Sequence, residues 1–485
     1  MKTLNGLVFF AAVLCCALAS GASPDTTSPV ELQPGTYPLV DRHLIAEMRN
    51  LTHVLHPPVR REVVLTMDRP WEGRLSGYGT VLRDPEGRIR LYYRGGGDVD
   101  PPEVTCVAWS RDGVSFERPT LGLYEIRGTR DNNVVFTAPD RSSYGESHNF
   151  APFYDTNPAA RPEEQWKAVA LRIAPDASGD ERRMLTVLAS PDGLKWRHLA
   201  PQPVIREGAF DSLNVAFFDP HIRRYACHFR IGVRGLRSIA RTESEDFLSW
   251  TTPTACEFRP PQVEHYYTNA TVALPRAPGM YLAFPMRFVP ERTSAGNPPR
   301  PVDGLCDAIL LSSHGGRVWD RTFREAFIRP GPDPDNWGDA HCNQTPLTGL
   351  IETAPGETSI YWFEGCLSGT PRIRRGTFRT DGLASIRAGA DPGELLTPPL
   401  TIPAQGERRL SLNMATSAVG SVRVEVLDPY GLPVEGWAAS DCKEIVGDGH
   451  QWPVRWGDKD TLPRETPIRL RFLLKDADLY AVTIN

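Results

Sequence analysis

Ser110-Arg-Asp-Gly-Val-Ser-Phe116 is a phrase that returns four times along this chain of 485 residues. The first residues of successive copies lie 80, 54, 69 and 66 residues apart. A phrase that recurs at such distances predicts a repeat architecture in which each copy closes one structural unit. The later copies are Ser190-Pro-Asp-Gly-Leu-Lys-Trp196, Ser244-Glu-Asp-Phe-Leu-Ser-Trp250, Ser313-His-Gly-Gly-Arg-Val-Trp319 and the weaker Arg379-Thr-Asp-Gly-Leu-Ala-Ser385.

Each unit shows the same order of short extended runs and turns. In the first unit, residues 79–82 and 89–94 read as strands around a turn at 84–87. Residues 105–109 form a third run, and a fourth strand is expected to begin at Phe116. Four strands joined by tight turns form an antiparallel meander. Within the phrase, the Asp-Gly pair supports the turn and the aromatic residue packs between sheets, so we expect its Asp residues to be structural.

The composition favours an all-β chain. The 45 prolines and 41 glycines separate short extended segments from one another. Five four-stranded sheets arranged radially form a five-bladed β-propeller, which we predict for residues 61–395. Residues 396–485 contain shorter strands without the phrase and predict a small C-terminal β-sandwich. Residues 23–60 form an N-terminal segment before the predicted propeller, which we call the lead-in. The net charge of −5, without a basic stripe, gives no indication of a nucleic-acid partner.

The N-terminus predicts export. Lys2 precedes an apolar run from Leu7 to Leu18, and Ala17-Leu18-Ala19 has the form that signal peptidase accepts. We therefore expect residues 1–22 to be a removed signal peptide and the protein to be periplasmic or secreted. A membrane anchor is the alternative, but the run is short for a span, and no other segment is apolar enough. The seven cysteines beyond the signal lie far apart, without Cys-x-x-Cys, so we expect most to be buried as small apolar residues.

Candidate site residues stand just before the innermost strand of each blade, because those positions ring the mouth of the central channel. Carboxylates gathered beside aromatic walls suit a sugar, and cleavage of a glycosidic bond needs two carboxyl groups. Each carboxylate alone could equally cap a turn, and the asparagines could be turn residues. A calcium or sodium ion on the axis is a further alternative. The carboxylates are Glu72, Glu146, Asp211, Glu264 and Asp339, accompanied by His148, Asn149, Asn214, His265, Tyr266, Tyr267, Asn269, Trp337 and His341.

Several stretches resemble the five-bladed propeller glycoside hydrolases of families 32, 43, 62 and 68. The chain is most similar to exported family-32-like proteins of planctomycete-type bacteria, although it lacks the Asn-Asp-Pro-Asn-Gly stretch of true invertases. The resemblance implies that Glu72 is the base or nucleophile, that Asp211 orients the substrate, and that Glu264 is the general acid. Glu146 is the alternative general acid. The matching stretches are Asp68-Arg-Pro-Trp-Glu72, His148-Asn-Phe-Ala-Pro152, Asp155-Thr-Asn-Pro158, Phe210-Asp-Ser212, 323–331 and Asp476-Ala-Asp-Leu-Tyr480.

The sequence therefore predicts an exported glycosidase that acts on oligo- or polysaccharides. We expect it to need no cofactor, apart from a possible structural calcium ion at the axis. One alternative is a carbohydrate-binding propeller without catalysis. Another is a sialidase-like enzyme, since the phrase resembles the sialidase Asp-box and Tyr266 or Tyr267 could be a nucleophile. Sialidases, however, need an arginine cluster, and the blade openings of this chain carry acids instead.

Overall fold

The protein is described by a computed structural model that covers residues 28–96, 103–138, 145–176, 178–294, 304–337, 343–367, 369–403, 406–465 and 467–485. Strands dominate these ranges, whose only helical elements are the 3-10 turns η1 (Pro162–Glu164) and η2 (Pro334–Trp337). The all-β prediction is confirmed. No helix in the described ranges has the length and apolar character needed to cross a membrane. The predicted signal peptide, residues 1–22, lies outside the described residues.

The first three sheets are antiparallel meanders that follow one another along the chain. Their order is β6-β7-β8-β9, β10-β11-β12-β13 and β14-β15-β16-β17. The outermost strand of the first sheet is β9, so the prediction of a fourth strand from Phe116 was wrong; only an isolated bridge joins Trp109 and Glu117 there. The strands are β6 (Gly77–Arg83), β7 (Ile89–Gly96), β8 (Glu103–Ser110), β9 (Val134–Phe136), β10 (Ala151–Tyr154), β11 (Trp166–Pro175), β12 (Glu181–Ser190), β13 (Arg197–His198), β14 (Val215–Asp219), β15 (Arg224–Val233), β16 (Leu236–Ser244) and β17 (Thr254–Ala255).

The fourth sheet is larger than a meander. Strands β20, β21, β24 and β25 are antiparallel neighbours, and β18 joins β25 in parallel. A separate three-stranded sheet, β19-β22-β23, extends the second and third strands beyond Phe284 and Ile309. The strands are β18 (Glu257–Arg259), β19 (His265–Tyr266), β20 (Val272–Ala273), β21 (Met280–Ala283), β22 (Met286–Val289), β23 (Leu305–Ala308), β24 (Leu311–His314) and β25 (Val318–Asp320).

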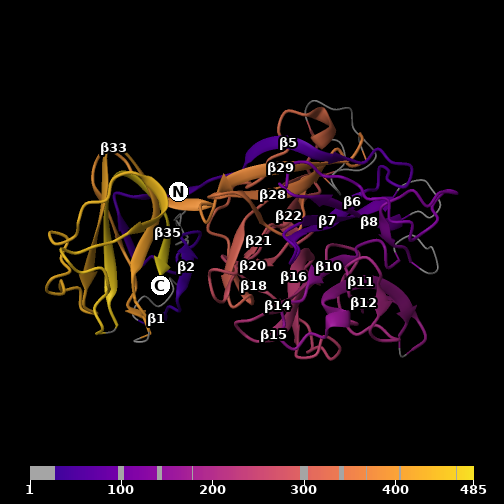
Figure 1. The fold of residues 1–485 in the computed structure, drawn as a ribbon, viewed down its shortest axis with the longest axis horizontal. Coiled ribbons are helices and arrows are strands. Elements are labelled where there is room, and N and C mark those ends of the chain that lie inside the picture. Colours follow the sequence, from indigo (N-terminus) through magenta and orange to yellow (C-terminus); the bar gives the residue numbers. More distant parts are fainter. Residues whose placement is uncertain are drawn as a thin grey trace, which may run out of the picture.

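The fifth sheet joins the two ends of the repeat region. Its outermost strand is β5 (Val59–Thr66), which comes from before the first sheet and pairs with β29 (Arg372–Arg379). Figure 1 shows β5 and β29 side by side along one edge of the larger body. The remaining strands are β26 (Thr345–Pro346), β27 (Ile351–Ala354) and β28 (Glu357–Glu364).

The repeated phrase forms a hydrogen-bonded turn. Gly113 N donates to Ser110 Oγ at 2.8 Å, and Asp112 Oδ1 accepts from the N–H groups of Val114 and Ser115 at 2.8 and 2.9 Å. The same bonds recur around Ser190 and Asp192 in the second sheet. The prediction that the phrase is structural is therefore confirmed for these copies.

These turns also tie neighbouring sheets together. Tyr361 of the fifth sheet donates to the carbonyl of Gly113 at 2.7 Å, and Tyr92 of the first sheet donates to the carbonyl of Gly193 at 3.0 Å. Each glycine has a positive φ, and an added Cβ would lie within 2.7 Å of the tyrosine oxygen. The first sheet thus contacts both the second sheet and the fifth, which lies at the other end of the repeat region.

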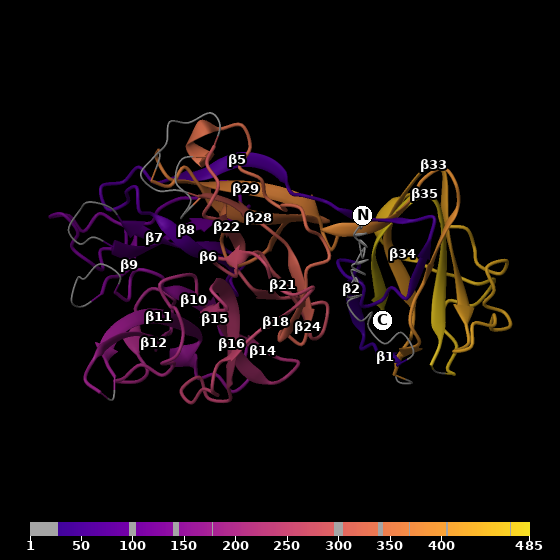
Figure 2. The ribbon, with the colours of Figure 1, turned by 180° about the vertical axis from the view of Figure 1, so that it is seen from behind.

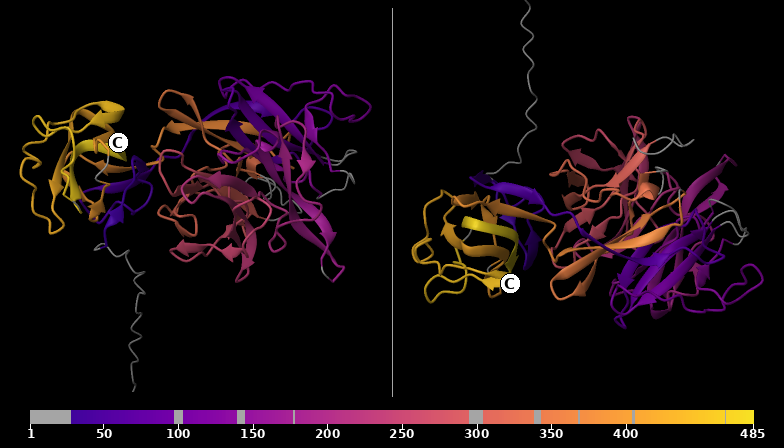
Figure 3. Two further views of the ribbon diagram at one scale, coloured as in Figure 1. Left: turned by 60° about the horizontal axis from the view of Figure 1, so that its bottom comes forward. Right: turned by 90° about the horizontal axis from the view of Figure 1, so that it is seen from above.

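The remaining strands form a smaller body with its own core (Figures 1 and 2). Its eight-stranded sheet is built on β33 and β35, and it includes β2, β3 and β4 from the lead-in and β30 and β31 from the end of the predicted propeller. Both views in Figure 3 show the early strands lying beside the late ones. The strands are β1 (Val30–Glu31), β2 (Gly35–Pro38), β3 (Glu47–Arg49), β4 (Thr52–Leu55), β30 (Ala384–Ala388), β31 (Gly393–Leu396), β32 (Leu400–Thr401), β33 (Leu410–Leu427), β34 (Asp448–Pro453) and β35 (Arg469–Ile484).

The cysteines behave as the sequence predicted. The six cysteines within the described residues are buried, so burial as small apolar side chains is confirmed for them, while Cys342 lies outside the described residues. The six are Cys106, Cys227, Cys256, Cys306, Cys366 and Cys442.

Candidate functional site

The predicted site lies at one end of the sheets, where the innermost strands β6, β10, β14, β20 and β26 begin; we call this end the entry face. In an antiparallel meander the second strand ends and the third strand begins at that same end. Residues of the hairpins between second and third strands therefore share the entry face with the residues that precede the inner strands. These hairpins supply Arg94, Glu103, Arg183, Arg230 and Arg237, none of which was predicted.

Asp211 is a half-buried carboxylate on the entry face. Its side chain keeps 28% of its surface exposed and forms ion pairs with Arg230 and, at 3.4 Å, with Arg183. The next residue, Ser212, donates its hydroxyl to the carbonyl of Tyr267 at 2.6 Å, which fixes this loop against the fourth sheet. Asp211 thus presents a fixed, partly exposed carboxylate, the kind of group that accepts hydrogen bonds from sugar hydroxyls.

Tyr267 provides an aromatic wall beside Asp211. The guanidinium carbon atoms of Arg230 and Arg237 lie 4.9 and 5.2 Å from its ring centroid. Phe288 stands edge-on to the same ring, with 6.0 Å between the ring centroids. Two cations over one aromatic ring are a cation–π arrangement that fixes both the ring and the guanidinium groups.

His148 connects the first sheet to this cluster. Its Nδ1 lies 2.6 Å from Glu103 Oε1, and Arg94 donates to its backbone carbonyl at 3.1 Å. Burial, together with the Arg94 guanidinium, lowers the pKa of His148, while the carboxylates of Glu103 and Asp211 act in the opposite direction. We therefore expect a neutral imidazole at pH 7, held between carboxylates from the first and third sheets.

Glu264 lies in a second polar cluster, on the fourth sheet. Its side chain is 26% exposed and pairs with Arg287 at 2.9 Å and with Arg321 at 3.0 Å. Arg287 is shared with Asp307, and these neighbouring carboxylates raise the pKa of Arg287 against the effect of its burial. Tyr266, the next residue but one, is buried, and its burial raises the pKa of the phenol to about 12. The phenol is thus protonated at neutral pH.

Glu72 does not open onto the entry face. Its side chain is fully covered, and it accepts hydrogen bonds from Tyr93 at 2.5 Å and from Arg118 at 2.8 and 2.9 Å. The N–H of Arg69 also donates to it at 3.1 Å. Every one of these partners belongs to the first sheet or to the segments around it. Glu72 therefore serves as a buried structural anion, and the geometry does not suit the base or nucleophile that the resemblance implied.

Glu146 and the asparagines hold the sheets together. Glu146 is buried and lies 2.9 Å from His198 Nε2, within its own sheet. Asn149 donates to the carbonyls of Phe210 and Ser212, and Asn269 donates to the carbonyl of Leu213 at 2.9 Å, so both join neighbouring sheets. Asn214 donates to the carbonyl of Phe210 at 3.0 Å, within its own loop. These contacts match the turn and packing alternative that the sequence left open.

Of the remaining predicted residues, two lie within the described ranges. His265 accepts a hydrogen bond from the N–H of Arg237 at 3.1 Å, and its burial lowers its pKa. Trp337, in η2, donates its indole N–H to the carbonyl of Gly331 at 2.7 Å. Asp339 and His341 lie outside the described residues.

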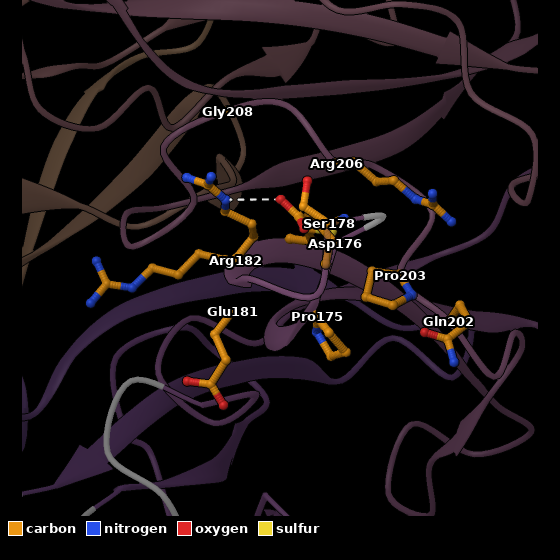
Figure 4. Close-up of a pocket in the computed structure, with 11 residues that line it drawn as sticks. Pro175, Asp176, Ser178, Glu181, Arg182, Gln202, Pro203, Arg206 and Gly208 are labelled. Atoms are coloured by element: carbon orange, nitrogen blue, oxygen red, sulfur yellow. Dashed lines mark hydrogen bonds and ion pairs between the residues drawn. The ribbon is translucent and has the colours of Figure 1, made fainter.

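An open pocket of about 810 Å³ adjoins Asp211 on the entry face. Arg183, which pairs with Asp211, is part of its wall. Figure 4 shows Arg182 paired with Asp176 and Arg206 extending on the other side of Asp176. The lining is Pro175, Asp176, Ser178, Glu181, Arg182, Arg183, Met184, Gln202, Pro203, Arg206 and Gly208.

A second cavity, of about 820 Å³, runs between the sheets and is mainly apolar. Residues of β6, β10, β14 and β20 line it, together with the β26–β27 connection and the start of β27, so the first strands of four sheets and a segment of the fifth face one common space. Asp219, His221 and Glu352 line it near the opposite ends of those strands. Within the ranges that the structure describes, no group of three or more His, Cys, Asp and Glu side chains could hold a metal ion.

No family model and no curated protein matches the chain. Among solved structures, one described as a glycoside hydrolase covers 67% of this chain and 92% of its own length, at 11% identity and a TM-score of 0.44. An N-acetylgalactosamine deacetylase from F. plautii, solved with blood group B trisaccharide, covers 67% and 95%, at 12% and 0.44. A thermostable family-43 glycoside hydrolase covers 65% and 92%, at 13% and 0.40. At these scores we assign the chemistry of this chain from its own residues alone.

Proposed function

We propose that the chain is an exported glycoside hydrolase built as a five-bladed β-propeller with a C-terminal β-sandwich. Two features support the architecture: the first and fifth sheets are in contact, and residues from all five sheets line one cavity. Strands β2, β30 and β31 pair with β35, while β3 pairs with β31 and β4 pairs with β30. This pairing suggests a propeller of residues 59–379 and a sandwich of residues 28–55 and 384–485. Export rests on the predicted signal peptide, residues 1–22.

The catalytic carboxylates that we propose are Asp211 and Glu264. The observation that carries this choice is their exposure: each retains about a quarter of its side-chain surface, while the side chain of Glu72 retains none. In this proposal Glu264 is the general acid, and Asp211 orients the substrate or activates water. Tyr267 gives a sugar ring an apolar face on which to stack. The proposal keeps the predicted role of Glu264 as general acid, adds activation of water to the predicted orientation of the substrate by Asp211, and no longer assigns a catalytic role to Glu72.

A non-catalytic carbohydrate-binding protein is the second candidate. It is favoured by the pairing of Asp211 and Glu264 with two arginines each, because such carboxylates are well placed to accept hydrogen bonds from sugar hydroxyls without transferring a proton. The proposal requires no cofactor. A structural calcium ion on the axis stays a prediction; Asn149 Oδ1 and Asn214 Oδ1, buried without hydrogen-bond partners among the described residues, are oxygens of the kind that calcium accepts.

Hydrolysis of aryl glycosides and of plant or algal oligosaccharides by the purified protein separates the two candidates. If the proposal holds, Glu264→Gln and Asp211→Asn lower turnover of the best substrate by about a hundredfold or more while sugar binding persists. The matched control is Glu243→Gln, because Glu243 also pairs with two arginines, at 3.0 and 2.7 Å, but lies on β16 away from the entry face. Binding of sugars without turnover supports the second candidate. Full turnover by both site variants contradicts the hydrolase assignment.

A further inference from the structure

Two arginines of the entry face, Arg237 and Arg206, differ from Arg183 and Arg230 in having no carboxylate partner among the described residues. Arg237 is half-buried, and its guanidinium group lies over Tyr267 and Phe288, at 5.2 and 5.1 Å from the ring centroids. Arg206 is exposed and lines the 810 Å³ pocket. Across the described residues, neither guanidinium has a carboxylate within 4.0 Å, whereas Arg183 and Arg230 both pair with Asp211.

The position of Arg237 is fixed without an anion. Its backbone N–H donates to His265 and its carbonyl accepts from the side chain of Gln262 at 2.8 Å, while the two aromatic rings hold the guanidinium plane. A guanidinium group presents its donors in a planar fork that matches a carboxylate or a sulfate oxygen pair. Arg237 is therefore a preorganised, positively charged donor next to the aromatic wall where a sugar ring would stack.

A continuous chain of contacts joins Arg237 to the pocket. From Arg237 the path runs through Tyr267 and Arg230 to Asp211, and from there through Arg183 into the pocket wall that also holds Arg206. The whole chain has a formal net charge of −5, so unpaired arginines at both ends of this path do not follow from its overall composition. A ligand that carries several negative charges along its length fits this distribution.

We propose that the entry face recognises an anionic saccharide, one that bears carboxylate or sulfate groups, and that Arg237 and Arg206 bind those groups. This inference rests on the proposed carbohydrate function and specifies the substrate class. Asp211 stays the acceptor for sugar hydroxyls, and Tyr267 the stacking surface.

Calorimetric titration of the full-length protein tests the proposal with three probes. They are an oligogalacturonate, its carboxyl-reduced neutral counterpart and a sulfated galactan oligosaccharide of similar length. We expect at least one anionic probe to bind ten- to a hundredfold more tightly than the neutral one, as a charged hydrogen-bond pair would give. The difference in affinity between the anionic and the neutral probe should decrease as the salt concentration is raised from 50 to 500 mM. The two anionic probes distinguish carboxylate from sulfate recognition.

Variants assign the effect to the arginines. Arg237→Gln should lower the affinity for the preferred anionic probe by about tenfold or more, and leave the neutral probe within about twofold. Arg111→Gln is the control, because Arg111 is exposed and lies in the first phrase turn, at the other end of the sheet. Equal affinity for all three probes, or equal loss for neutral and anionic probes in Arg237→Gln, overturns the inference but leaves the carbohydrate function standing. Failure of every probe to bind overturns the inference and removes support from the proposed function as well.

Discussion

Glu72→Gln should destabilise the protein without removing its active site. The substitution keeps the shape of the side chain but takes away a charge that accepts hydrogen bonds from Arg118 at 2.8 and 2.9 Å and from Tyr93 at 2.5 Å. Arg118 would then be left as a largely buried cation without its main partner. Breaking a buried ion pair from one side costs about 3–5 kcal/mol. The retained amide oxygen can still accept one of these bonds, so we expect the lower part of that range.

Urea unfolding monitored by fluorescence measures the loss of stability, and a sugar-binding assay measures separately whether the active site is retained. In a parallel thermal-unfolding experiment, a loss of about 3 kcal/mol should lower the apparent melting temperature by roughly 4–5 °C, at about 2.1 cal/mol/K per residue over a body of about 320 residues. Asp68→Asn is the control, since Asp68 is an exposed partner of the same Arg118 at 3.6 Å and should cost at most about 1 kcal/mol. Folded Glu72→Gln should bind and turn over sugar as the wild type does. Unchanged stability combined with abolished turnover refutes this reasoning and restores Glu72 as a catalytic residue.

Three further predictions concern stability and binding. Burial, with the nearby Asp41 carboxylate, raises the pKa of Asp320 from 3.8 to about 6. The folded protein then holds a proton that the unfolded chain releases between about pH 4 and pH 6, so this group makes stability fall as the pH rises through that window. In urea unfolding, Asp320→Asn should therefore exceed the wild type in stability at pH 8 by roughly 1–2 kcal/mol, after allowance for partial exposure, with a smaller gain at pH 4.5; a gain that is equal at both pH values argues against this cause. Gly193→Ala should cost more than about 2 kcal/mol, because it combines a positive φ of 74° with a Cβ only 2.6 Å from Tyr92 Oη. Gly122→Ala, with a φ of 66° and open space around the Cβ, should cost about 1 kcal/mol, and equal losses on thermal unfolding would show that the contact between sheets is unimportant. Tyr267→Ala should weaken sugar binding by about tenfold in calorimetric titration, and undiminished affinity would exclude stacking on this ring.

The repeated phrase made much of the larger body predictable. Its Ser, Asp and Gly residues form local turns. The flanking segments have the short extended pattern of strands in an antiparallel meander. What could not be predicted is pairing between distant segments. Strand β5 completes the fifth sheet from more than 300 residues away, and β2 pairs with β35 at the other end of the chain. The local pattern of such a strand gives no information about its partner.

The candidate site was predictable only in part, for the same reason. The position of a carboxylate before an inner strand predicted the entry face for Asp211, whose ion pairs with Arg183 and Arg230 are formed with hairpin residues of that end. It could not show that Arg118, 46 residues later, covers Glu72 completely. Arg230 and Arg237 were missed because only the residues before inner strands were searched. The polarity of a meander places hairpin residues at the same end, and this rule would have found them.

A structure of the protein with a bound oligosaccharide tests the central claim most directly. We expect a sugar ring on Tyr267, with its hydroxyls within hydrogen-bond distance of Asp211 and its charged group at Arg237. A sugar that binds only in the smaller body, or in the apolar cavity at the far end of the inner strands, would contradict the account.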